Sequence, residues 1–135
     1  MIEIKRDVLT AEQFISLWES VWDGAPSYEQ TKLALGHSAV TLTAFDGDTP
    51  VGMARAIGDM GLCYYIKDVV VIPSYQGMGI GRMMMDELLD FIRENGVRGT
   101  DIAVELCAVP DKMPFYEKLG FAANEAQRLR KYLKV

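Results

Sequence analysis

The sequence predicts a single domain of mixed α+β class over residues 1–135. Segments with strand and helix periodicity alternate in the order β-α-α-β-β-β-α-β-α-β. A long apolar strand in the middle of the chain is followed by an amphipathic helix and another strand, which is the layout of a crossover unit. No repeat, low-complexity tract or Pro/Ser-rich linker divides the chain. Its 135 residues are a usual length for one core.

The first third of the chain predicts one strand and two helices. Residues 2–5 alternate apolar and polar side chains, as a half-buried strand does. Thr10 and Gln13 have the spacing of a capping box, so a helix is expected to begin there. Ser27 is the expected N-cap of a second helix, which Gly36 ends.

The middle of the chain predicts a hairpin followed by a central strand. Strands over residues 40–45 and 51–57 flank the turn Asp46-Gly47-Asp48. Residues 63–72 are rich in Val, Ile and Tyr, which favours a buried strand. Pro73 closes it, because proline has no N–H to donate to a sheet.

The last third predicts a helix, a strand, a short helix and a final strand. Apolar residues fall on one stripe of a helix over residues 79–95, and Gly96 ends it. A strand is expected over residues 102–107 and a short helix over 114–119. Residues 129–135 alternate enough to predict one more strand.

Charge and composition exclude several classes of function. The net charge of −5 argues against nucleic-acid binding, which needs a basic face. No apolar run approaches the ~20 residues that cross a bilayer, and residues 1–6 lack the order of a signal peptide, so a cytoplasmic location is expected. Cys63 and Cys107 form no CxxC pair, and a single His cannot complete a zinc site with them. They are predicted to be free, buried thiols.

The segment Gln76-Gly77-Met78-Gly79-Ile80-Gly81-Arg82 links the central strand to the long helix. Glycines remove the β-carbons that would keep a ligand away from the backbone. The first-turn amides of a helix lack partners, and with the helix dipole they suit a pyrophosphate. Arg82 adds a positive charge. The spacing is neither GxGxxG nor Walker A, and the alternative is a helix start whose glycines only permit close packing.

This segment resembles the Gln/Arg-x-x-Gly-x-Gly/Ala signature of the GNAT superfamily of N-acetyltransferases. Residues 115–121, Phe-Tyr-Glu-Lys-Leu-Gly-Phe, resemble a second block of that family, and residues 51–56 resemble its third strand. The likeness covers about residues 40–121. It implies a mixed, mostly antiparallel twisted sheet with helices on both faces and a splay between the fourth and fifth strands. The run at residues 68–73 is similar to that of small bacterial and plastid amine acetyltransferases.

The resemblance also implies a reaction. Acetyl-CoA would be the cosubstrate, without a metal, and the acetyl group would pass to a primary amine of a small molecule by direct attack in a ternary complex. Tyr116 matches the tyrosine that gives a proton to the departing thiolate; a phenol holds its proton at neutral pH. The coenzyme contacts that the likeness implies are Val69, Val70, Val71, Gln76, Gly77, Met78, Gly79, Ile80, Gly81 and Arg82.

Asp68 interrupts the apolar central strand, and a carboxylate is costly to bury unless it is paired or works on a proton. It is therefore a candidate general base. An ion pair with Arg55, or a water-relayed path without a dedicated base, is the alternative. Since the first two helices of family members often border the acceptor, Trp22 and Tyr28 are candidate pocket residues; packing on the sheet is the alternative for Trp22. Tyr65, in the central strand, is a third candidate, and packing in the core is its alternative.

Two other functions stay open on the sequence. Acetylation of a protein lysine or N-terminus would need an open groove, and a non-catalytic coenzyme A-binding sensor or interaction module would bind without turnover. The resemblance also implies a homodimer, since many family members pair their C-terminal strands.

Overall fold

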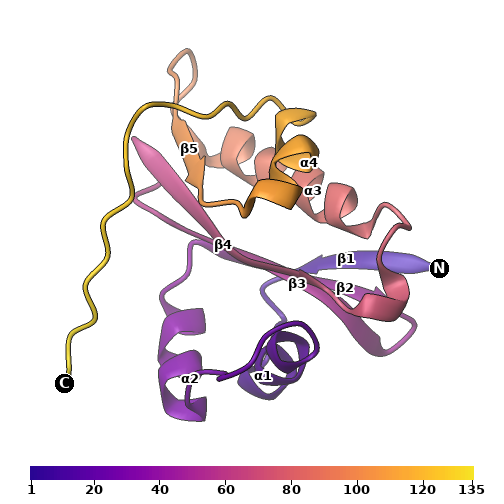
Figure 1. Cartoon of the computed structure of the whole chain (residues 1–135). Coiled ribbons are helices and arrows are strands. Elements are labelled where there is room, and N and C mark those ends of the chain that lie inside the picture. The colour runs from indigo at the N-terminus through magenta and orange to yellow at the C-terminus, as the bar shows by residue number, and fades with distance from the viewer.

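The computed structural model describes all residues, 1–135 (Figure 1). Its elements follow the predicted order up to the last one. They are β1 (Ile2–Arg6), α1 (Ala11–Glu19), α2 (Tyr28–Gly36), β2 (Val40–Asp46), β3 (Thr49–Gly58), β4 (Cys63–Val71), α3 (Ile80–Asn95), β5 (Ala103–Leu106) and α4 (Met113–Glu117), with 3-10 turns at Pro73–Tyr75 and Pro110–Lys112. None of the helices combines the length and the apolar character that a bilayer crossing requires.

The five strands form one sheet in the order β1-β2-β3-β4-β5. Neighbouring strands are antiparallel except β4 and β5, which run parallel. The parallel pairing extends only from Cys63↔Ala103 to Ile66↔Leu106. The rest of β4, residues 67–71, is unpaired on that side, so the predicted mixed sheet with a splay between the fourth and fifth strands is confirmed.

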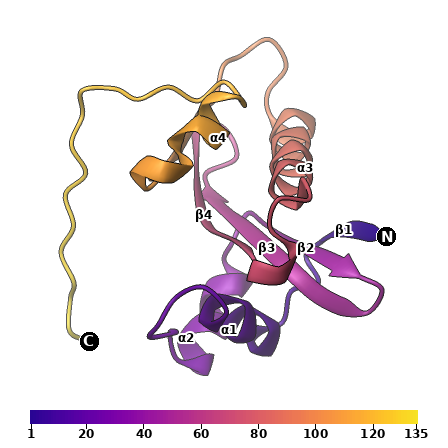
Figure 2. The ribbon, with the colours of Figure 1, turned by 45° about the vertical axis from the view of Figure 1, so that its right-hand side comes forward.

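Helices cover both faces of the sheet. Helices α1 and α2 lie on one face, and α3 and α4 lie on the other (Figures 1 and 2). On the α1 face, Phe14 and Leu17 pack with Met53 and Val70 in a small buried cluster. On the α3 face, the buried stripe of the long helix packs on the strands and forms the main core. Its helical members are Ile80, Met84, Met85, Leu88 and Ile92.

Local signals placed the first helices correctly. The Thr10 hydroxyl accepts from the Gln13 amide at 3.1 Å, and the Gln13 side chain accepts from the Thr10 amide at 3.1 Å, which completes the capping box. Ser27 caps α2 by accepting from the Gln30 amide at 3.1 Å. These contacts satisfy helix-end amides that would otherwise lack partners.

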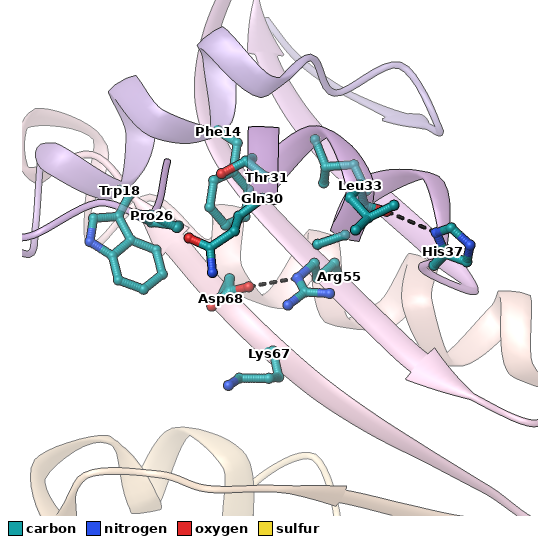
Figure 3. A pocket seen from close by; sticks show the side chains of 12 residues that line it. Phe14, Trp18, Pro26, Gln30, Thr31, Leu33, His37, Arg55, Lys67 and Asp68 are labelled. Atoms are coloured by element: carbon teal, nitrogen blue, oxygen red, sulfur yellow. Dashed lines mark hydrogen bonds and ion pairs between the residues drawn. The ribbon is translucent and has the colours of Figure 1, made fainter. Parts of the chain in front are cut away.

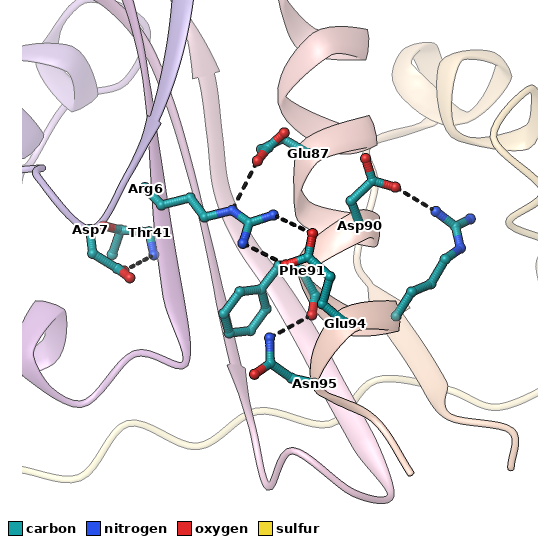
Figure 4. A network of polar contacts seen from close by, with 9 residues as sticks. Arg6, Asp7, Thr41, Glu87, Asp90, Phe91, Glu94 and Asn95 are labelled. Atoms are coloured by element: carbon teal, nitrogen blue, oxygen red, sulfur yellow. Dashed lines mark hydrogen bonds and ion pairs between the residues drawn. The ribbon is translucent and has the colours of Figure 1, made fainter. Parts of the chain in front are cut away.

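An ion-pair network ties the edge strand β1 to α3. Arg6 donates from Nε to Glu87 at 2.9 Å and from Nη1 to Glu94 at 2.8 Å, and its guanidinium lies 5.5 Å from the ring centre of Phe91 (Figure 4). The hydrogen bonds that Arg6 donates to the carboxylates of Glu94 and Glu87 raise the pKa of Arg6 above its ordinary value. Arg6 thus stays charged, and β1 is held against the helix that starts at the glycine segment.

Two sequence predictions about this fold are wrong. Residues 129–135 form no strand: the segment after Phe121 runs away from the sheet and pairs with no other strand (Figures 1 and 2). An alternating pattern is compatible with a strand, but a strand also has to pair with the edge of a neighbouring strand. Cys63 and Cys107 are free as predicted but exposed, not buried, because each lies at an end of a strand on the sheet's β4–β5 side.

Candidate active site

A bulge in β4 shapes the centre of the molecule. Met53 pairs with Val70 and Arg55 with Lys67, so Ala54 of β3 faces two residues of β4. Asp68 has a φ of 55°, in the left-handed region that non-glycine residues rarely adopt. Successive residues of a regular strand point to opposite faces, whereas a bulge re-aims them. Lys67 and Asp68 consequently line the same cavity.

Asp68 is held by a buried ion pair with Arg55. Arg55 Nε donates to Asp68 Oδ2 at 2.6 Å, and the two side chains are only 14% and 8% exposed. Arg55 Nη1 also donates to Ser38 Oγ at 3.3 Å. Asp68 Oδ1 accepts no hydrogen bond from the chain. The ion pair with Arg55 that the sequence left open is therefore present, and one carboxylate oxygen stays free for an acceptor.

The pair lies at the base of a cavity of about 620 Å³ between α1, α2 and the sheet (Figure 3). Its wall combines apolar side chains with the charged groups of β3 and β4. The lining residues are Phe14, Trp18, Pro26, Gln30, Thr31, Leu33, Ala34, Leu35, His37, Arg55, Lys67 and Asp68. Trp22, Tyr28 and Tyr65, the aromatic residues expected to border the acceptor, are not among them. Tyr28 lines a separate hollow on the outer side of α2.

The glycine segment follows the C-terminal end of β4, a few residues after Asp68. Gly77 and Gly79 have φ of 82° and 81°, and a β-carbon on either would meet no atom within 4 Å. Glycine is favoured at both positions because of this backbone conformation and not because of crowding, and the space beside them is open to a ligand. Gly79 caps α3 without a side-chain hydrogen bond, so the amides of the first helical turn are unpartnered.

Gly81 has a different reason to be glycine. A β-carbon there would lie 3.3 Å from the ring of Phe115, so this position permits α4 to pack closely on α3. The segment is also held at its start: Gln76 Nε2 donates to the Val71 carbonyl at 2.9 Å. Arg82, expected to face an anion, donates along the helix to Asp86 at 3.2 Å and is exposed.

The sequence matches the model of the Acetyltransferase (GNAT) family over residues 8–121. The chain belongs to the GNAT family. It is 36% identical over 131 residues to an uncharacterized N-acetyltransferase, ycf52, of Porphyra purpurea, covering 89% of this chain and 72% of that protein. It is 39% identical over 100 residues to chloroplastic serotonin N-acetyltransferase 2 of Oryza sativa subsp. japonica, covering 71% of this chain but only 48% of that protein.

A solved structure agrees with this GNAT fold. A protein of unknown function from methicillin-resistant Staphylococcus aureus, described as a probable acetyltransferase, superposes with a TM-score of 0.84. The two share 28% identity, and the match covers 100% of both chains. The protein is therefore an acetyl-CoA-dependent N-acetyltransferase, and the glycine segment, with open space and unpartnered amides, fits the pyrophosphate of that cosubstrate.

Tyr116 lies on α4, on the opposite face of the sheet from α1, α2 and the cavity that they border (Figure 1). Its ring packs between Phe115 and Phe121, with centroids 4.9 and 6.0 Å away. Burial raises the pKa of the Tyr116 phenol above its ordinary value, so the hydroxyl holds its proton at neutral pH. Tyr116 and the cavity that Asp68 lines therefore lie on opposite faces of the sheet.

Sequence reasoning missed several cavity residues of the enzyme. Gln30 and His37 line the cavity; His37 also caps the C-terminal end of α2, and its Nδ1 contacts the Leu33 carbonyl at 3.0 Å. Trp18 lines the cavity as well. No local pattern distinguishes these residues from ordinary helix residues, because their role depends on how α1 and α2 lie over β4.

Proposed function

We propose that this GNAT enzyme acetylates a primary amine of a small molecule by direct attack in a ternary complex. The observation that carries the proposal is the cavity of about 620 Å³ over the Arg55–Asp68 pair, next to the unpaired end of β4. That volume is typical of small-molecule sites. The similarity to a serotonin N-acetyltransferase, named for a small amine, supports the same class.

Acetyl-CoA would supply the activated acyl group, and the chain would hold it mainly through its backbone. The amides of Gln76, Gly77, Met78, Gly79, Ile80, Gly81 and Arg82 would bind the pyrophosphate. The backbone of Val69, Val70 and Val71, which has no β5 partner, would bind the pantetheine arm and the acyl carbonyl. Their side chains only need to be apolar.

Asp68 and Tyr116 would handle the protons. Asp68 would accept the proton that the attacking amine must lose, through the oxygen that Arg55 leaves free. Tyr116 would give its proton to the sulfur as the C–S bond breaks and the C–N bond forms. Trp22, Tyr28 and Tyr65 could touch only a part of the acceptor that reaches beyond the cavity, since they do not line it.

Thiol release from acetyl-CoA tests the proposal. The panel holds polyamines, arylalkylamines, amino acids, aminoglycosides and a lysine peptide, with calorimetry of coenzyme A binding alongside. We expect saturable release with at least one small amine and little with the peptide. Turnover confined to the peptide would contradict the small-molecule proposal. Coenzyme binding without any turnover would favour a sensor.

The role of Asp68 has its own test. Asp68→Asn keeps the shape of the side chain and its contact with Arg55 but removes the base. We expect turnover to fall most at low pH, where the amine is mostly protonated, while acetyl-CoA affinity survives. An unchanged pH–rate profile would exclude Asp68 as the base.

We also propose that the protein is a homodimer in the cytoplasm. In the segment after Phe121 four apolar residues are 75% exposed or more, namely Leu129, Tyr132, Leu133 and Val135, and the outer edge of β5 is open. A second copy could cover both. Light scattering of the full chain should give twice the 15.1 kDa mass; a monomer would contradict the proposal. The free, exposed cysteines suit a reducing compartment.

A further inference from the structure

The acceptor cavity reverses the charge balance of the protein. The whole chain carries 19 acidic against 14 basic residues, for a net charge of −5. Among the residues that line the cavity, however, Arg55 and Lys67 are basic and Asp68 is the single carboxylate. His37, the remaining titratable group, uses Nδ1 on a backbone carbonyl. The cavity is thus electropositive inside an acidic protein.

Lys67 is the charge without a partner. Arg55 and Asp68 neutralise each other at 2.6 Å, whereas Lys67 makes no salt bridge and is half-buried. Figure 3 shows it on β4 next to Asp68, with no contact drawn to any carboxylate. The bulge at Asp68 is what brings it to the same cavity. A partly buried cation is costly unless something compensates it, and an anionic occupant would do so.

We propose that the acceptor is a primary amine that also carries an anionic group, a carboxylate or a phosphate, bound by Lys67. This rests on the proposed function, since it names the class of amine. The amine faces Asp68, the anion faces Lys67, and apolar side chains such as Phe14 and Trp18 contact the carbon skeleton. An acceptor with only positive charge leaves Lys67 uncompensated and adds a second cation beside it, which disfavours polyamines and simple arylalkylamines.

Matched acceptor pairs test this class. The pairs are 6-aminohexanoate against hexylamine, 4-(2-aminoethyl)benzoate against 2-phenylethylamine, and 4-aminobutyl phosphate against 4-aminobutanol. Within each pair the anion is far from the amine, so the basicity of the amine changes little. We expect kcat/KM to be about tenfold or more higher for the anionic member, as for other hydrogen bonds to charged groups. The carboxylate and phosphate pairs show which anion is preferred.

Substitution of Lys67 connects the preference to the residue. Lys67→Met should bring the ratio within each pair close to one, and Lys67→Arg should retain a preference because it keeps the charge. Lys32→Met is the matched control: it removes the same charge from an exposed position of α2 outside the cavity lining and should leave the ratio unchanged.

The outcomes separate the two proposals. The anionic-acceptor inference is overturned if kcat/KM is as high for the amines without an anion as for those with one. It is also overturned if Lys67→Met leaves the ratio unchanged. In both cases the amine acetyltransferase proposal stands. If no amine of either kind releases thiol, the proposed function fails, and the inference fails with it.

Discussion

The two halves of the candidate active site are built in different ways. The proposed coenzyme side is contiguous: residues 69–82 carry the end of β4, the glycine segment and the first turn of α3, and they would bind mainly through the backbone. The proposed acceptor side is assembled from α1, α2, β3 and β4, and it would bind through side chains from Phe14 to Asp68. One side is therefore a local structure, and the other exists only once the chain has folded.

The two sides are also stabilised differently. The glycine segment depends on backbone conformations, with Gly77 and Gly79 at positive φ, and on contacts at its border such as that of Gln76 with Val71. The acceptor cavity depends on one buried charge pair, Arg55 and Asp68. Substitutions should separate the two: backbone changes should affect coenzyme affinity, and charge changes should affect the cavity and the acceptor.

The largest effect is expected from a residue outside both binding regions. Tyr116→Phe removes the proposed proton donor but keeps a ring to pack between Phe115 and Phe121. We expect kcat to fall by about 10²–10⁴-fold, the usual contribution of general acid catalysis. Affinities for coenzyme A and for the acceptor should change little, as measured by calorimetry and KM.

The pH dependence of the wild-type enzyme sharpens this prediction. An acid must be protonated to act, and burial raises the pKa of Tyr116. The alkaline decline in kcat caused by Tyr116 should therefore have its midpoint above the ordinary phenol pKa of about 10. It should be absent in Tyr116→Phe. An unchanged kcat in this variant would show that Tyr116 is a packing residue.

The next largest effect is expected in the acceptor cavity. Arg55→Leu leaves the Asp68 carboxylate buried without its partner, so the free energy of unfolding should fall by about 3–5 kcal/mol in urea titrations. The double variant with Asp68→Leu should recover part of that loss. Arg93→Leu is the control: its ion pair with Asp90 is exposed, so the loss should stay within about 1 kcal/mol. Equal losses in the two single variants would contradict the importance of burial.

The glycine segment should respond through affinity. Gly79→Ala places a β-carbon at a φ of 81°, which costs about 1–3 kcal/mol and should weaken coenzyme A binding by roughly 10–100-fold. Gly99→Ala is matched in conformation, with a φ of 83° in the loop between α3 and β5, and in open space. It should lower stability without lowering coenzyme affinity. Equal affinity losses in both would show that the effect is not local.

The contrast also explains what the sequence could predict. Capping at Thr10 and Ser27, the hairpin turn at Gly47 and the glycine segment all depend on residues a few positions apart, so their placement was correct. The strand predicted over residues 129–135 was wrong because pairing is not a local property: the segment has the right alternation but no neighbouring edge within the chain.

Single residues of the proposed acceptor side also show which features a sequence can predict and which it cannot. Asp68 stood out because a carboxylate interrupts an apolar strand, and Arg55 was a candidate partner. The sequence did not predict the bulge that directs Lys67 and Asp68 to one cavity, since neither residue is a glycine. The cavity wall formed by Gln30 and His37 depends on how α2 is placed, and residue spacing does not encode that placement.

The smallest effect is expected where the coenzyme side is tied to the rest of the sheet. Tyr75, just before the glycine segment, donates its hydroxyl to Asp46 in the β2–β3 turn, and this bond lowers the pKa of Asp46. Tyr75→Phe should loosen the segment and raise the KM for acetyl-CoA a few-fold, with kcat at saturation unchanged.

Because Asp46 must be ionised to hold this bond fully, the difference from wild type should shrink as the pH falls through the lowered pKa of Asp46. Asp46→Ala, which removes the acceptor of this bond, should behave like the tyrosine variant. A lower kcat with an unchanged KM would contradict a positioning role, because the segment would then affect the chemical step and not coenzyme binding.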